Sequence, residues 1–96
     1  MTSKQRAYLR GQANTLDPIF QIGKTGLSEN LLKQLSDALE ARELIKITTL
    51  ETAPSSAKEL SIEISNKVDT EVIQVIGNKI TLFRQKKKNS RYNLPQ

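Results

Sequence analysis

The chain has 96 residues and a mass of 10.8 kDa, which is enough for one small domain and excludes an enzyme with a cleft between two domains. Its lack of cysteine and histidine excludes disulfide bonds, thiolate nucleophiles, Ser-His dyads and zinc sites built on those residues. The formal net charge is +5, and no apolar run is long enough to span a bilayer, so we expect a cytoplasmic protein that does not enter a membrane.

The N-terminal residues predict a weak helix and then a short strand. Thr2–Gln5 fits a capping box, and Leu9 and Ala13 fall on one face of the helix that follows. Gly11 costs this helix about 1 kcal/mol relative to alanine. Pro18–Ile22 alternates its apolar residues and is followed by a glycine, a pattern typical of a short strand that opens at a proline.

The central part of the chain predicts a helix, a strand and a second helix. Ser28–Arg42 is the clearest helix, because its leucines recur at helical spacing behind a serine N-cap. Leu44–Leu50 alternates β-branched residues, as a strand does. Residues 55–67 are ambiguous, since part of the segment alternates like a strand, whereas Ser56 and Glu59 form a second capping box before helically spaced apolar residues. We expect a helix there.

The last two elements are predicted to form a hairpin. Val72–Ile76 and Lys79–Arg84 are apolar and rich in β-branched residues, and Gly77–Asn78 between them is a two-residue turn signal. The order αβαβαββ predicts one small α/β domain over residues 1–84, with a mixed four-stranded sheet and helices packed on it in two or three layers. Residues 85–96 offer little apolar surface to a core, so we expect them to form a basic flexible tail.

Positive charge gathers at the two ends of the chain. Residues 1–13 carry three basic side chains and residues 84–96 carry five, with no acid in either, whereas the middle carries 7 basic and 10 acidic side chains. Such ends suit a polyanionic partner, although ends that aid solubility or bind nucleic acids and membranes without selectivity are an equal alternative. The candidate RNA-binding side chains at the ends are Lys4, Arg6, Arg10, Arg84, Lys86, Lys87 and Lys88.

The sequence Gly-Lys-Thr-Gly at residues 23–26 lies between a predicted strand and the N-terminus of the clearest helix. Exposed backbone N–H groups and the positive end of a helix dipole favour an anion at such a corner. Glycines let a nucleic-acid backbone approach closely, and Lys24 adds a cation. For a lone pattern of this kind, a turn that needs glycine only for its dihedral angles is the alternative. Together with the basic ends, the pattern makes Gly23, Lys24, Thr25 and Gly26 candidate RNA-binding residues.

We do not expect catalysis. Gly23–Thr25 mimics the end of a nucleotide-binding P-loop, but Pro18 occupies the position where that motif needs its first glycine. The acid pairs Glu40 with Glu43 and Asp69 with Glu71 lie at predicted element ends amid ordinary surface charge. The few aromatic residues disfavour a sheet that stacks bases. The sequence therefore predicts no enzyme activity, no catalytic residue, no metal, no cofactor and no small-molecule substrate.

Four blocks of the chain resemble a known family. In order, they are Ser3–Arg10, Pro18–Ser28, Ala38–Lys46 and Gln74–Arg84, and they are similar to the YhbY proteins, stand-alone bacterial members of the CRM domain family, named for chloroplast RNA splicing and ribosome maturation. The chain departs from the family pattern in two places. It reads Val68-Asp69-Thr70 where Thr-Gly is frequent, and it has Phe83 where tyrosine is common.

The resemblance implies a fold similar to the C-terminal domain of translation initiation factor three and an RNA-binding loop at Gly23–Gly26. It also implies association with precursors of the large ribosomal subunit, so the expected partner is rRNA. We separately expect the protein to be a monomer. A competing hypothesis is a peripheral interaction protein. In that case the Lys86–Lys88 tail binds acidic lipid or an acidic protein, and the loop is purely structural.

Overall fold

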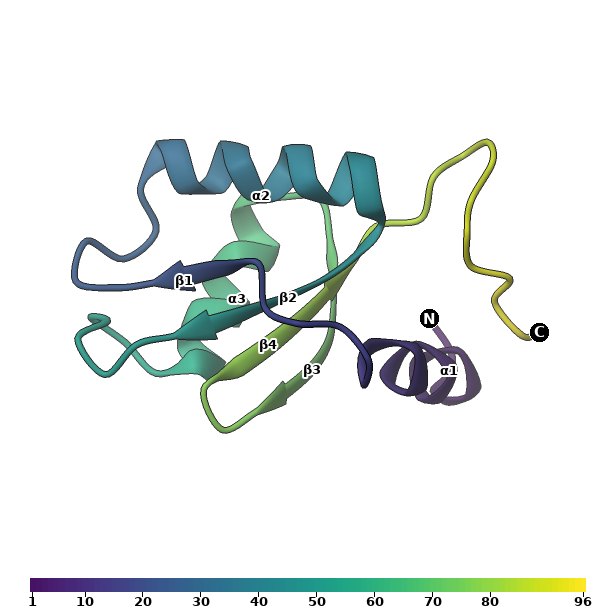
Figure 1. Ribbon diagram of the computed structural model, residues 1–96, viewed down its shortest axis with the longest axis horizontal. Helices are drawn as coiled ribbons and strands as arrows, with labels where there is room; N and C mark the ends of the chain where they lie inside the picture. Colours follow the sequence, from purple (N-terminus) through teal and green to yellow (C-terminus); the bar gives the residue numbers. More distant parts are fainter.

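The computed structural model describes all 96 residues and contains the seven predicted elements in the predicted order (Figure 1). They are α1 (Ser3–Ala13), β1 (Phe20–Ile22), α2 (Glu29–Arg42), β2 (Leu44–Thr49), α3 (Ala57–Lys67), β3 (Glu71–Ile76) and β4 (Lys79–Phe83). None of the three helices is long and apolar enough to cross a membrane.

Each helix begins at a side chain that accepts a hydrogen bond from the first turn, as the sequence predicts. Thr2 and Ser56 form complete capping boxes, and the Ser28 hydroxyl accepts the amide of Leu31. The segment that the sequence leaves ambiguous is a helix in the structure. The capping box at Ser56 provides acceptors for amide groups of its first turn, which have no acceptor within the helix itself. The buried apolar side chains of α3 are Ala57, Leu60 and Ile64, which recur at helical spacing, whereas Ile62 is exposed.

The four strands form one mixed sheet in the order β1-β2-β4-β3. β1 is parallel to β2, while β4 is antiparallel to both of its neighbours, so β3 runs parallel to β2 with β4 between them. The predicted hairpin is present, and Gly77 has φ +57° at the first of its two central positions. A positive φ at that position is what a type II′ turn requires, and glycine adopts it without strain.

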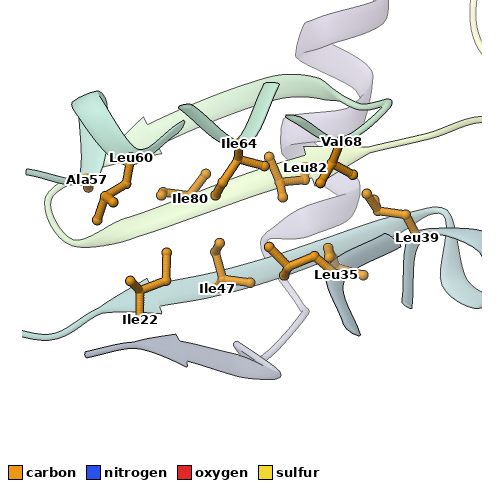
Figure 2. Close-up of a cluster of buried hydrophobic side chains, with 11 residues drawn as sticks. Ile22, Leu35, Leu39, Ile47, Ala57, Leu60, Ile64, Val68, Ile80 and Leu82 are labelled. Carbon is orange, nitrogen blue, oxygen red and sulfur yellow. The ribbon is translucent and has the colours of Figure 1, made fainter. Parts of the chain in front are cut away.

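The core is divided between the two faces of the sheet. α2 and α3 cover one face and enclose the larger apolar cluster, drawn in Figure 2, in which Leu35 and Leu39 meet Ile47 and Ile80. α1 packs on the other face, where Leu9 contributes to a second cluster with Phe83. The molecule therefore has three layers, but α1 covers only one end of its face of the sheet (Figure 1).

The segment after β4 has no helix or strand but contacts the domain. Tyr92 and Leu94 pack against the smaller cluster, and the rings of Tyr92 and Phe83 meet edge to face with centroids 5.8 Å apart. These contacts are not predictable from the sequence, because two apolar side chains in a polar stretch give no periodic signal. The flexibility of residues 85–96 stays a prediction.

Candidate nucleic-acid interface

The loop at residues 23–26 is a tight turn that presents its two central residues to solvent. The amide of Gly26 donates to the carbonyl of Gly23 at 2.9 Å, which places the exposed Lys24 and Thr25 at the corners. The backbone amides of Lys24 and Thr25 have no acceptor within the protein. The turn leads directly to Ser28 and the N-terminus of α2, so free N–H groups and the positive end of the helix dipole lie together.

The two glycines of this loop have different structural roles. Gly26 is buried and has φ +66°, and a Cβ atom there would lie 2.9 Å from Cγ of Pro54. The turn therefore needs glycine at position 26 for both its dihedral angle and its packing. Gly23 has no positive φ, and a Cβ atom there would meet Cδ1 of Leu50 at 3.5 Å, an ordinary contact distance. The backbone does not demand glycine at position 23.

The loop lies at the end of the sheet where β1 and β2 finish. The amide of Leu50 donates to the carbonyl of Ile22 at 2.8 Å, and the amide of Thr49 donates to the carbonyl of Asn78 at 2.7 Å. These bonds hold the loop after β1, the connection after β2 and the β3–β4 hairpin at one end of the molecule. α1 and the C-terminal segment lie at the other end (Figure 1).

Two of the predicted RNA-binding arginines hold the fold together. Arg84 Nε donates to the carbonyl of Asp69 at 2.6 Å, and its guanidinium also bonds to the carbonyl and hydroxyl of Ser36. Arg6 Nη1 donates to the carbonyl of Val72 at 2.6 Å, beside the bulge in β3. Both arginines also pair with acids, Arg84 with Glu40 and Asp69 and Arg6 with Glu71. Their charges are therefore already engaged within the domain.

The remaining basic candidates are exposed or half-buried at the α1 end of the molecule. Lys4 and Arg10 are exposed on α1, and neither has an ion pair. Lys87 and Lys88 are exposed, and with Lys86 they line a shallow hollow that also contains the carboxylates of Glu40 and Asp69. These two acids offset part of the positive charge of the tail. The structure thus divides the predicted site residues between two ends and does not gather them around the loop.

Glu43 is the residue whose role the sequence analysis missed. The prediction that Glu43 belongs to ordinary surface charge is wrong, because the structure buries this residue completely. Its carboxylate accepts hydrogen bonds from the amides of Lys86 and Arg91 at 3.0 and 2.7 Å and from the hydroxyl of Ser90. Burial raises the pKa of Glu43, but these hydrogen bonds and the charge of Lys86 outweigh burial and hold its pKa below the ordinary value. Burial and, to a smaller extent, the negative charge of Glu43 raise the pKa of Tyr92.

A sequence signal for this role was available. α2 ends at Arg42 and β2 begins at Leu44, so Glu43 alone makes the connection. It does so with φ +67°, a backbone conformation that a non-glycine residue adopts only when its surroundings hold it there. A one-residue link between a helix and a strand therefore points to a residue held by specific contacts.

Comparison with known proteins shows the family of the chain. The CRS1/YhbY (CRM) domain matches residues 1–84 of the chain. "Probable RNA-binding protein YqeI" of Bacillus subtilis is 39% identical over 95 residues, which cover 99% of both proteins. A protein of Methanocaldococcus jannaschii named in the same way is 33% identical over 94 residues, 96% of this chain and 69% of that relative.

A solved structure gives the same fold. The solution structure of a Staphylococcus aureus protein, described as a candidate RNA-binding protein, superimposes with a TM-score of 0.83. The two sequences are 46% identical, and the superposition covers 99% of each chain. The fold predicted from the sequence is thus confirmed, and the chain belongs to the CRS1/YhbY (CRM) domain family.

Proposed function

We propose that this protein binds RNA without catalysing a reaction, and that it associates with rRNA of precursor large ribosomal subunits during their assembly in the cytoplasm. Its relatives are named as RNA-binding proteins, which supports RNA as the class of partner. The resemblance to the YhbY proteins supports the ribosomal assignment. In this proposal the protein acts as a monomer, and the Gly23–Gly26 loop and nearby basic side chains make the contacts.

The observation that carries the proposal is the pair of free amides at the corners of the loop. The amides of Lys24 and Thr25 are exposed and find no acceptor in the protein, so they are free to donate to a ligand in place of water. A phosphate oxygen is a suitable acceptor, because it meets both donors together with the positive end of the α2 dipole. The Lys24 ammonium group adds a charge-assisted contact, and Gly23 keeps side-chain atoms away from the approaching backbone.

The proposed mode of binding is recognition of the RNA backbone. Contacts to phosphate and sugar position a protein on RNA and carry little sequence information. All four aromatic side chains belong to the two apolar clusters or pack against them, so none forms an exposed stacking platform for bases. RNA shape would then decide which segment is bound.

Sedimentation on a ribosome gradient tests this function. Tagged protein expressed in bacterial cells should co-migrate with precursor large subunits and be released by RNase treatment. Protein that stays at the top of the gradient and binds vesicles of acidic phospholipid instead would overturn the proposal in favour of a tail that binds acidic lipid.

A further inference from the structure

Part of one face of the sheet has no helix packed on it. On the side opposite α2 and α3, α1 packs over the end of the sheet that includes Leu44 and Phe83. Ile22 and Ile47 are buried in the larger cluster on the side of α2 and α3. Because side chains alternate between the two faces of a strand, their chain neighbours Gln21 and Thr48 lie on the opposite side. No element of the chain covers the part of the face between α1 and the Gly23–Gly26 loop (Figure 1).

This uncovered face carries positive charge without acids. Arg10 of α1 lines a shallow hollow of about 170 Å³ together with Lys46 of β2 and Lys79 of β4. None of the eight residues that line it is acidic. Unlike Arg6 and Arg84, these three cations make no ion pair and no side-chain hydrogen bond within the protein.

The register of the strands shows that the charges continue from the loop. Gln21, two residues before Gly23, pairs with Thr48, and Thr48 pairs with Lys79. The next row inward contains Lys46, which pairs with Thr81. Neighbouring strands lie about 4.8 Å apart, so this polar and basic surface begins beside the loop and extends across the sheet toward α1.

The chemistry of this face fits an RNA backbone rather than exposed bases. It has three free cations for phosphates, and Gln21, Thr48 and Gln74 supply hydrogen-bond donors and acceptors for ribose hydroxyl groups. It offers no aromatic ring on which a base could stack.

We propose that the uncovered part of this face is a second RNA-contact surface, on which Arg10, Lys46 and Lys79 bind consecutive phosphates of a strand that continues from the Gly23–Gly26 loop. The inference rests on the proposed function and extends it, because it assigns to this chain a binding face outside the loop. It also accounts for how one RNA reaches from the Gly23–Gly26 loop to the basic side chains at the α1 end of the molecule.

Salt-dependent RNA binding by a triple variant tests this surface. The variant carries Arg10→Gln, Lys46→Gln and Lys79→Gln, which remove charge but keep long polar side chains. The control carries Lys33→Gln, Lys58→Gln and Lys67→Gln, three exposed positions on α2 and α3. The probe is purified bacterial large-subunit rRNA. Its affinity for each protein is measured by filter binding between about 50 and 200 mM salt, a range over which phosphate contacts lose much of their contribution to affinity.

The expected result is a change in both affinity and slope for the sheet-face variant only. With ~0.7 counterions released per contact, loss of three contacts lowers the slope of log K against log salt by about 2 and weakens binding about a hundredfold near 0.1 M salt. The control should change affinity less than about threefold and leave the slope intact. Equal behaviour of the two variants would overturn the inference, while absence of binding by the unaltered protein would overturn the proposed function.

A second measurement keeps the test decisive if the triple variant does not fold. In the unaltered protein, amide resonances of β2 and β4 should shift when rRNA fragments are added, along with those of the loop. Shifts confined to the loop would contradict the sheet-face contact.

Discussion

The buried residue Glu43 connects several segments at the α1 end of the molecule through hydrogen bonds. It accepts three hydrogen bonds from the C-terminal segment, while its own carbonyl accepts the amide of Arg84 at 2.8 Å. The helix α2, the strand β2 and the C-terminal segment therefore meet at one residue. All three hydrogen bonds from the C-terminal segment are accepted by the Glu43 carboxylate, and such bonds are stronger when the acceptor is charged.

The stability contributed by Glu43 should depend on pH. Because the folded-state pKa lies below the ordinary value of about 4.3, the contribution is full above that pH and is lost as pH falls through the folded pKa. Glu43→Gln should lower the free energy of unfolding by about 1–3 kcal/mol at pH 7. Urea denaturation at several pH values measures this, and a difference between the two proteins that does not shrink toward pH 2 would contradict the account.

Arg84 should contribute to stability more than to RNA binding. Its side chain is 17% exposed and joins α2 to the turn before β3, so Arg84→Ala removes several charge-assisted hydrogen bonds. We expect a loss of about 2–3 kcal/mol in thermal or urea unfolding. Lys87→Ala is the matched control on the exposed tail and should stay within about 0.5 kcal/mol of the unaltered protein. Equal stability of the two variants would show that the Arg84 contacts are not energetically significant.

Alanine substitutions at the two glycines of the loop should affect stability and RNA binding differently. Gly26→Ala forces a positive φ on alanine and a contact with Pro54, so we expect a loss of more than about 1 kcal/mol. Gly23→Ala should change stability by less than about 1 kcal/mol but weaken binding to rRNA, because the added methyl group restricts the approach of a phosphate. Thermal unfolding and filter binding measure the two effects. If the Gly23→Ala protein binds rRNA with full affinity, then Gly26 is the only one of the two glycines that the loop requires.

At the scale of elements, the C-terminal segment behaves in the structure as part of the smaller cluster. Removal of residues 86–96 takes away three donors from Glu43 and the Tyr92 ring from Phe83. We expect the truncated protein to lose about 2–4 kcal/mol, a fall in melting temperature of about 10–20 °C for a domain of this size. The control keeps the segment but replaces Lys86, Lys87 and Lys88 with glutamine. If truncation leaves the melting temperature unchanged, the segment is a flexible tail as its composition suggests.

The sequence predicts the elements well because their signals are local. The caps at Thr2, Ser28 and Ser56 and the Gly77 turn are each read from a few consecutive residues, and all are confirmed. The strand order is not readable in this way, because the insertion of β4 between β2 and β3 depends on contacts between distant segments. For the same reason, the sequence does not show that Lys46 lacks an ion-pair partner.

The candidate site was predictable only in its loop. Gly23–Gly26 is recognisable from sequence because a turn, a helix N-terminus and a lysine coincide there. The engagement of Arg6 and Arg84 by carbonyl groups is not, since their partners lie 66 and 15 residues away. Net charge at a chain end therefore says where cations are, and only the fold says which of them are free to bind a ligand.

At the scale of the whole molecule, RNA affinity should fall steeply with salt. The free cations along the proposed path are Lys24, Arg10, Lys46 and Lys79, with Lys87 and Lys88 on the tail. If about 4 to 6 of them neutralise phosphates, the slope of log K against log salt is roughly −3 to −4. Filter binding over a salt series measures it. A nearly flat slope would reject backbone recognition.

The most direct test of the central claim changes the two corners of the loop. Lys24→Asp with Thr25→Asp keeps both glycines and adds acids ahead of the positive end of α2, so the melting temperature should stay close to that of the unaltered protein. Binding to rRNA should be lost, because two carboxylates occupy the place of the expected phosphate. The matched control, Asn66→Glu with Lys67→Glu, makes the same change in net charge on exposed residues at the far end of α3 and should retain most of the affinity. If the loop variant folds and binds rRNA as well as this control does, the loop is only a turn, and the RNA site lies elsewhere.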